Sequence, residues 1–287
     1  MLRTNKTVVK SGLIQSNNPF TMKPTIIKTP KLKRIFAAVT VVMCLASCQK
    51  SLSGIAGDAP DHNLVIKFNA VVDTANLILG DEYRNIFNEP YTVSAFKYYV
   101  HAIQLINTDS AEVFELPKDK YYLVDFSDSA STMIKAGVHP YKYNRIAFII
   151  GVDSARNVSG AQTDALDPTK GMFWTWNTGY IMAKLEGNSP VASTPNNAFE
   201  YHIGGFRTGE NVIQKITLLF PFTTEIDLKP NKSSQIDISA NVNAWFYNPH
   251  DIQLSTQPVC MTPGPLAMQI AENYRKMFTV VNIVNEP

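Results

Sequence analysis

Apolar and polar residues alternate with a period of two through much of the chain after residue 62. Every even position of residues 64–72 is apolar, and the even positions of residues 96–106 form a similar series in which only Gln104 is polar or charged. Successive side chains of a β-strand point to opposite faces, so each series predicts a strand whose apolar side chains share one face. We therefore expect strands in both segments.

Six further segments have the composition of strands and are separated by clusters of Asn, Asp, Gly, Pro and Ser, which favour turns. They are residues 121–126, 144–150, 179–186, 198–203, 212–220 and 234–243. No helical period intervenes, so we expect an all-β fold, an antiparallel β-sandwich of about eight strands. Pro265 is suited to open one short C-terminal helix, in which apolar residues from Leu266 to Phe278 recur on one face.

The N-terminal segment has the layout of a secretory signal peptide. Eight basic and no acidic residues precede position 48, and the apolar run 35–46 is too short to span a bilayer. It ends in Leu-Ala-Ser-Cys48, which resembles a bacterial lipoprotein box. We expect a signal peptide at residues 1–47, with Met22 as an alternative start, a lipidated tether at 48–62 and one domain at 63–287. The alternative is a short uncleaved anchor with a chance cysteine.

Lipid on Cys48 would attach the protein to a membrane without crossing it, since two or more acyl chains anchor firmly. Gln49 is not the acidic residue that retains many enterobacterial lipoproteins in the inner membrane. We therefore expect a protein of the cell envelope, anchored in the outer membrane and facing the periplasm. Cys44 leaves with the signal peptide, so Cys260 is the one free thiol, either a buried apolar filler or a soft metal ligand.

Removal of the signal peptide changes the charge of the protein. The whole chain has 26 basic and 24 acidic residues, a net charge of +2. Loss of the eight basic residues before Cys48 leaves an acidic body, which attracts cations and gains little from nucleic acid. We expect no nucleic-acid partner.

The motifs of several enzyme classes are absent from the sequence. It contains no Gly-x-Ser-x-Gly, His-Glu-x-x-His or phosphate-binding loop and no Cys-x-x-Cys pair, so we expect no catalytic activity. Asp153, Asn157, Asp164 and Asp167 leave two interpretations open. They either hold calcium, although their spacing matches no EF-hand, or form Asx turns and helix caps.

The segment around residues 171–182 is unusual because it contains two of the three tryptophans of the chain. If it is a strand, Met172, Trp174, Trp176, Tyr180 and Met182 stack along one side. Such a wall of thioether and aromatic groups is either core packing or the lining of a site.

Several motifs of this region together resemble the MbnP-like, methanobactin-associated copper-binding protein family. They are Gly-Val-Asp at 151–153, Leu-Asp-Pro-x-x-Gly-Met at 166–172, Trp-x-Trp-x-x-Gly-Tyr at 174–180, Lys-Leu-Glu-Gly at 184–187 and aromatic-x-x-His-Ile-Gly at 199–204. Segments 96–105, 122–125 and 270–278 are also similar. The resemblance implies a secreted or lipid-anchored β-sandwich that binds copper through histidines and a tryptophan oxidised to kynurenine by a partner dihaem peroxidase.

The resemblance can be transferred to four residues as candidate metal ligands. His202 matches the family histidine, with a hydrogen-bonded core histidine as the alternative. His101 is a candidate second ligand, although the family more often has serine there. Trp174 and Trp176 match the tryptophan pair, and their spacing does not choose between them. A nearby thioether or aromatic wall would favour the cuprous ion.

The other histidines are weaker candidates. His250 and His139 lie in turn-like sequence and His62 in the tether, and no two histidines are spaced to chelate from one element. Any copper site must therefore combine distant strands. Two functions remain: an exported lipid-anchored copper-binding protein of periplasmic copper acquisition or handling, and a metal-free β-sandwich lipoprotein that binds a ligand or partner.

Overall fold

The computed structural model describes residues 62–286 except residues 178 and 222–224. The expected signal peptide, the lipid-bearing Cys48 and the tether up to residue 61 lie outside the described residues. His62, expected to end the tether, is instead the first residue of a strand. None of the helices in the described ranges has the length and hydrophobicity needed to cross a bilayer.

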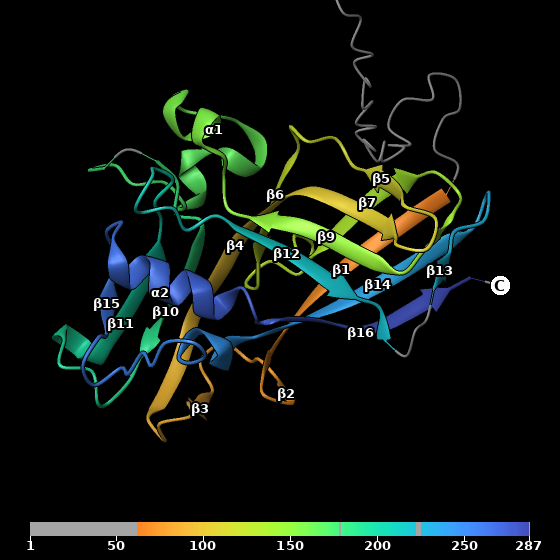
Figure 1. Ribbon diagram of the computed structural model, residues 1–287. Helices are drawn as coiled ribbons and strands as arrows, with labels where there is room; N and C mark the ends of the chain where they lie inside the picture. The colour runs from red at the N-terminus through yellow and green to blue at the C-terminus, as the bar shows by residue number, and fades with distance from the viewer. Residues whose placement is uncertain (1–61, 178, 222–224, 287) are drawn as a thin grey trace, which may run out of the picture. The chain divides into compact units, whose positions relative to one another are not determined.

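The described residues form three β-sheets (Figure 1). The first sheet contains β16 (Phe278–Asn285), β14 (Ser233–Asn241), β1 (His62–Val72), β2 (Ala75–Asn76) and β7 (Met133–Val138). The second contains β12 (Gln214–Leu219), β9 (Arg145–Ile150), β4 (Pro90–Asn107), β10 (Ala183–Asn188), β11 (Ala198–Ile203), β15 (Val259–Cys260), β3 (Glu82–Arg84), β5 (Glu112–Glu115) and β6 (Tyr121–Asp125). The third pairs β13 (Ile226–Asp227) with β8 (Lys142–Tyr143).

Helices are few and short. They are the α-helices α1 (Ser154–Val158) and α2 (Pro265–Tyr274) and the 3-10 helices η2 (Asp164–Leu166), η3 (Pro168–Lys170), η4 (Pro195–Asn197) and η6 (Val242–Trp245). Pro265 occupies the first turn of α2, as expected, but the helix ends at Tyr274. Phe278, expected on its apolar face, instead begins β16.

The all-β expectation is confirmed, but two details of the expected sandwich are wrong. The described residues contain sixteen strands, because β7, β16 and six strands of four residues or fewer escaped the sequence pattern. The sheets are also not purely antiparallel, since β1 pairs with β14, and β11 with β15, in parallel. Figure 1 shows β1 and β14 running side by side along the first sheet.

The two larger sheets pack through aromatic rings. Phe68 of β1 meets Tyr98 of β4 and Phe148 of β9 edge-on, with ring centroids 5.9 and 5.8 Å apart. All three side chains are at most 1 % exposed. Aromatic pairs in this geometry stabilise a core beyond the area they bury. The core therefore lies between the two larger sheets. The other face of the second sheet points away from this core.

A bulge in β4 changes which of its residues face the core. Ala102 has a φ of 48°, and the pairing register with β9 shifts between His101 and Gln104. An extra residue in one strand reverses the alternation beyond it. Beyond Val100 the buried apolar residues of β4 are therefore Ile103 and Leu105, and the expected placement of Ala102, Gln104 and Ile106 in the apolar row was wrong.

The segment 172–176 is not a strand, so the condition for stacking Met172, Trp174, Trp176, Tyr180 and Met182 along one side is not met. One isolated bridge joins Phe173 to Tyr180, and the segment otherwise forms a loop before β10. Trp174 is buried at 4 % exposure, whereas Trp176 is 59 % exposed. The two tryptophans therefore do not share a buried wall, and they occupy different environments.

Candidate functional site

Four polar side chains form a square on one face of the β10–β11 pair. Lys184 lies directly opposite His202, and Glu186 lies directly opposite Glu200. Residues two apart in a strand point to the same side, so the two pairs are neighbours. This face is opposite to the core, because the alternate residues Leu185 and Tyr201 are fully buried. We call these four residues the Glu–His square.

Glu186 is the centre of the contacts within the Glu–His square. Its Oε1 lies 2.5 Å from His202 Nε2 and 3.2 Å from Lys184 Nζ. The hydrogen bond from His202, supported by the charge of Lys184, lowers the pKa of Glu186 to about 2 against the effect of burial. Glu186 is therefore a carboxylate at neutral pH.

The Glu–His square also contains the donor atoms for a metal ion. Glu186, Glu200 and His202 each offer one ligand atom, and these atoms lie within 4.8 Å of one another. The carboxylate of Glu200 has no hydrogen bond or ion pair with any residue that the structure describes. Two carboxylates directly opposite each other repel, so a cation between them would be stabilised.

Trp174 lies next to the Glu–His square. The six-membered ring of its indole packs on Gly204, two residues after His202, so closely that a Cβ at Gly204 would come within 2.4 Å of it. Its Nε1 is buried without a hydrogen-bond partner. The exposed Trp176 packs against Trp174 in a tilted arrangement, with ring centroids 5.6 Å apart and an interplanar angle of 41°. Of the two tryptophans, the structure thus brings Trp174 to the strand of His202.

His101 lies elsewhere on the same sheet. Lys97 of β4 is in register with Lys184 and so with His202, and His101 is four residues further along β4. With a rise of about 3.3 Å per residue and about 4.8 Å between strands, its Cα lies on the order of 16 Å from that of His202. The structure therefore does not bring the two candidate histidines together.

The imidazole of His101 has its own surroundings. It stacks on Tyr121, with ring centroids 4.6 Å apart, and its Nε2 is buried without a hydrogen-bond partner. Burial lowers the pKa of His101, although Asp153 opposes the shift. Tyr121 donates its hydroxyl hydrogen bond to Asp153. His101 is thus a buried imidazole that stacks on Tyr121 and that burial keeps in its uncharged form at neutral pH.

His62 and His250 have hydrogen-bond partners, His139 packs edge-on against Phe114 with ring centroids 5.4 Å apart, and Cys260 is buried. His62 Nδ1 lies 2.5 Å from the carbonyl oxygen of Lys229, and His250 Nε2 lies 2.6 Å from Glu272. Cys260 is buried, and burial raises the pKa of its thiol to about 11. It is an apolar filler, the first of the two interpretations from the sequence.

The Asp-rich loop is built from helix caps. Asp153 accepts a hydrogen bond from Arg156 N at the start of α1, and Asp167 accepts one from Thr169 N at the start of η3. Asn157 Nδ2 donates to the carbonyl oxygens of Val152 and Asp153. Capping therefore accounts for Asp153 and Asp167, and among the described residues this loop holds no group of three close metal-binding side chains.

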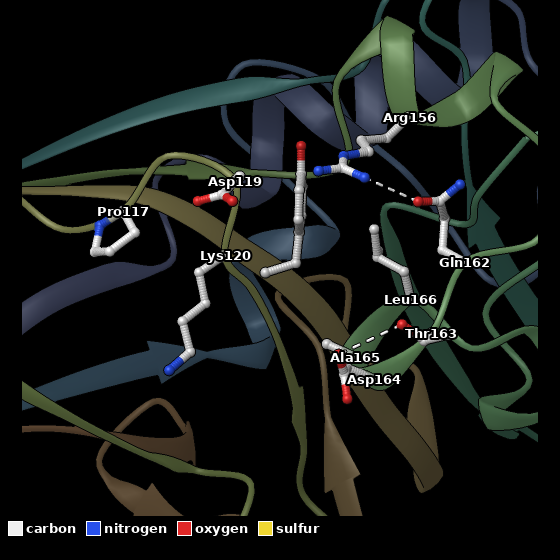
Figure 2. A pocket seen from close by; sticks show the side chains of 10 residues that line it. Pro117, Asp119, Lys120, Arg156, Gln162, Thr163, Asp164, Ala165 and Leu166 are labelled. Carbon is white, nitrogen blue, oxygen red and sulfur yellow. Dashed lines mark hydrogen bonds between the residues drawn. The ribbon is translucent and has the colours of Figure 1, made fainter.

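A cavity of about 700 Å³ lies beside this loop (Figure 2). Arg156 points toward Gln162 across it and donates a hydrogen bond of 3.0 Å to Gln162 Oε1. The other charged residues of the lining are Asp119, Lys120 and Asp164. Positive and negative groups are mixed, and among the described residues the cavity holds no group of three metal-binding side chains.

Sequence reasoning missed two members of the candidate metal site, Glu186 and Glu200. Glu200 precedes His202 by two residues, which places both on one face if the segment is a strand. Glu186 belongs to the Lys-Leu-Glu-Gly motif. The register that pairs it with Glu200 could not be read from the motif alone, because a shift of one residue would move it to the other face.

Comparison with known proteins gives one family and one solved structure. The MbnP family model matches residues 61–262. A solved structure, MbnP from Methylosinus trichosporium, shares 13 % sequence identity with a TM-score of 0.48, covering 78 % of this chain and 99 % of that chain. The curated proteins give no match. The family model, which covers most of the chain, carries the assignment.

Proposed function

Because this chain belongs to the MbnP family, we propose that it binds copper, and that His202, Glu186 and Glu200 hold the ion. The observation behind the proposal is the convergence of their ligand atoms within 4.8 Å on one face of the β10–β11 pair. His202 also matches the histidine of the family's sequence motif. The proposal therefore rests on two supports, which are the family resemblance and the metal-binding side chains found together in this chain.

The donor set fits the cupric ion better than the cuprous ion. One imidazole nitrogen and two carboxylate oxygens are ligands that suit Cu²⁺, which stands highest among the divalent ions in affinity for such sites. Cu⁺ prefers thioether and thiolate sulfur. Met182 Sδ is already engaged as the acceptor of a hydrogen bond of 3.1 Å from Val152 N. This arrangement revises the sequence-based expectation of a thioether wall that favours Cu⁺.

Trp174 is the better candidate for oxidation to kynurenine. An unmodified indole offers only an N–H donor and a π face, so neither tryptophan can be a σ-donor ligand as it stands. Trp174 is buried against Gly204 beside the strand of His202, whereas Trp176 is exposed. If a partner dihaem peroxidase modifies this chain, we expect the change at Trp174.

The proposed setting is the cell envelope. Lipid on Cys48 would anchor the protein in the outer membrane, where it would acquire or handle periplasmic copper without catalysis of its own. The signal sequence and the lipoprotein box support this part of the proposal. The alternative function is a metal-free lipoprotein that binds a ligand or partner, and the cavity beside Arg156 and Gln162 supports it.

Copper titration of the mature full-length protein tests the proposal. We expect one Cu²⁺ per chain and an electron paramagnetic resonance spectrum with coupling to one imidazole nitrogen. His202→Ala should weaken binding by at least ~100-fold, since it removes a direct ligand. His101→Ala is the matched control, because it also removes a buried histidine of the same sheet, and it should leave binding unchanged.

Two results would contradict the copper assignment. One is a wild-type protein that retains no copper after dialysis. The other is a loss of binding in His101→Ala with none in His202→Ala. Peptide mass spectrometry of protein from its native host tests the modification separately, since kynurenine differs from tryptophan by the loss of one carbon and the gain of one oxygen.

A further inference from the structure

Two lysines face each other beside the proposed metal ligands. Lys97 of β4 and Lys184 of β10 are directly opposite in the sheet. Like charges in this position destabilise a sheet unless each finds a partner. Lys97 pairs with Asp125 at 2.7 Å, and Lys184 pairs with Glu186 at 3.2 Å. Each lysine is thus bound to its own carboxylate on opposite sides of the pair.

The contact of Lys184 involves one of the proposed copper ligands, Glu186. Glu186 Oε1 receives both Lys184 Nζ and His202 Nε2. Only 13 % of the Lys184 side chain is exposed, so the ammonium group is held close to the Glu–His square rather than free in solvent. Among the described residues, it is the one lysine or arginine that forms an ion pair with any of the three proposed ligands, and its partner is Glu186.

We propose that Lys184 is an internal counter-cation, which neutralises Glu186 in the metal-free protein and must give up this contact when Cu²⁺ binds. This inference rests on the proposed function, since it describes the same site. The ammonium group compensates the two opposed carboxylates and thereby stabilises the empty site. It also competes with the metal, so that Lys184 limits the affinity of the site for copper.

Electrostatics gives the direction of the effect. Cu²⁺ and an ammonium group cannot share one carboxylate oxygen at close range without strong repulsion. Lys184 cannot move toward Lys97, because that position carries the same charge. The remaining carboxylate, Glu200, is itself a proposed ligand. Binding of Cu²⁺ therefore moves Lys184 away from every nearby carboxylate of the square, at a cost that the metal must offset.

Substitutions of Lys184 test the inference in the mature full-length protein. Lys184→Met keeps most of the length and removes the charge, so the affinity for Cu²⁺, measured against a competing chelator, should rise by about tenfold or more. Lys184→Arg keeps the charge and should stay within about threefold of wild type. Lys97→Met is the neighbouring control and should have a smaller effect than Lys184→Met.

Thermal unfolding gives a second readout. Without metal, Lys184→Met should melt below wild type, because Glu186 and Glu200 then repel without compensation. With saturating Cu²⁺ its melting temperature should rise by more than that of wild type. A lower melting temperature without metal together with a larger increase on adding Cu²⁺ would indicate that Lys184 competes with the metal. A general loss of structure would lower the melting temperature in both conditions.

The outcomes separate the inference from the function it rests on. If wild type binds Cu²⁺ through His202 but Lys184→Met binds equally or more weakly, the role of Lys184 is wrong and the copper site stands. An equal gain in Lys97→Met would also overturn it, since the effect would then belong to the charge of the whole face. If the wild-type protein binds no Cu²⁺, the proposed function and this inference both fail.

Discussion

Replacement of Glu89 by Gln tests how the strands around the proposed site are held. Glu89 immediately precedes β4 and is only 7 % exposed. Its Oε1 accepts from Ser255 N at 3.0 Å and Ser255 Oγ at 2.6 Å, and its Oε2 accepts from Leu254 N at 2.8 Å and Asn85 Nδ2 at 2.7 Å. Four donors therefore saturate one buried carboxylate.

The magnitude follows from counting these donors. The side-chain amide of Gln has one oxygen, so its NH₂ group must face two of the four donors. The Ser255 hydroxyl can rotate and accept from it, but a backbone N–H cannot. One partly buried backbone donor, Ser255 N, is then left unpaired, which costs about 1–3 kcal/mol. We expect Glu89→Gln to lower the free energy of unfolding by about 2 kcal/mol at pH 7.

The pH dependence provides a sharper test of the same contacts. Burial raises the pKa of Glu89, but the hydrogen bonds from Ser255, Asn85 and Leu254 outweigh it, so that the pKa is lower than usual. A lowered carboxylate pKa stabilises the fold above the unfolded value of about 4.3, and this contribution is lost as the pH falls through the folded value. The difference in the free energy of unfolding between wild type and Glu89→Gln should therefore become smaller below about pH 4.

Urea unfolding at pH 7 and in the acidic range measures both quantities. Glu225→Gln is the control, because Glu225 forms only a partly exposed pair with Lys142 at 3.7 Å, and it should change the free energy by less than about 0.5 kcal/mol. The argument would be refuted if Glu89→Gln lowered the free energy of unfolding at pH 7 by less than about 0.5 kcal/mol. It would also be refuted if the difference from wild type were the same at pH 7 and in the acidic range.

Two further predictions concern the surroundings of the site. Gly204→Ala should destabilise the protein by about 1–3 kcal/mol in thermal unfolding and change the tryptophan fluorescence, because the new Cβ would lie 2.4 Å from Trp174 and 2.9 Å from the carbonyl oxygen of Tyr180. An unchanged melting temperature and spectrum would show that Trp174 does not pack there. Cys260, buried with its pKa raised to about 11, should react with a maleimide at pH 7 only after unfolding, and labelling of the native protein at the rate of a free thiol would contradict its burial.

The sequence pattern predicted long strands well and special backbone positions poorly. Seven of the eight expected strands correspond closely to β1, β4, β6, β9, β11, β12 and β14, and the segment 179–186 overlaps β10 only from Ala183. β16 was missed because Phe278 also fits the apolar face of the preceding helical pattern. Ala102 carried no local signal, since a non-glycine residue with a positive φ is uncommon.

The candidate site was predictable only as far as its motif residues. His202 and Trp174 stood out by residue type and by family resemblance, and the structure places both beside β10. The choice between Trp174 and Trp176 required tertiary packing, because the spacing of two residues is the same for both. His101 was the second candidate ligand from the sequence, and only the sheet register shows that several residues and two strand positions separate it from His202.

The lack of closely spaced histidines had a specific physical consequence. It implied that any metal site must combine distant strands, whereas the Glu–His square draws on two neighbouring strands, β10 and β11, and uses one histidine and carboxylates in place of a second imidazole. Carboxylates opposed across a strand pair need a positive charge even when no metal is present. The position of Lys184 is therefore explained by the same feature on which the proposed metal site rests: opposed carboxylates need a positive charge, and we propose that the metal displaces the one that Lys184 supplies.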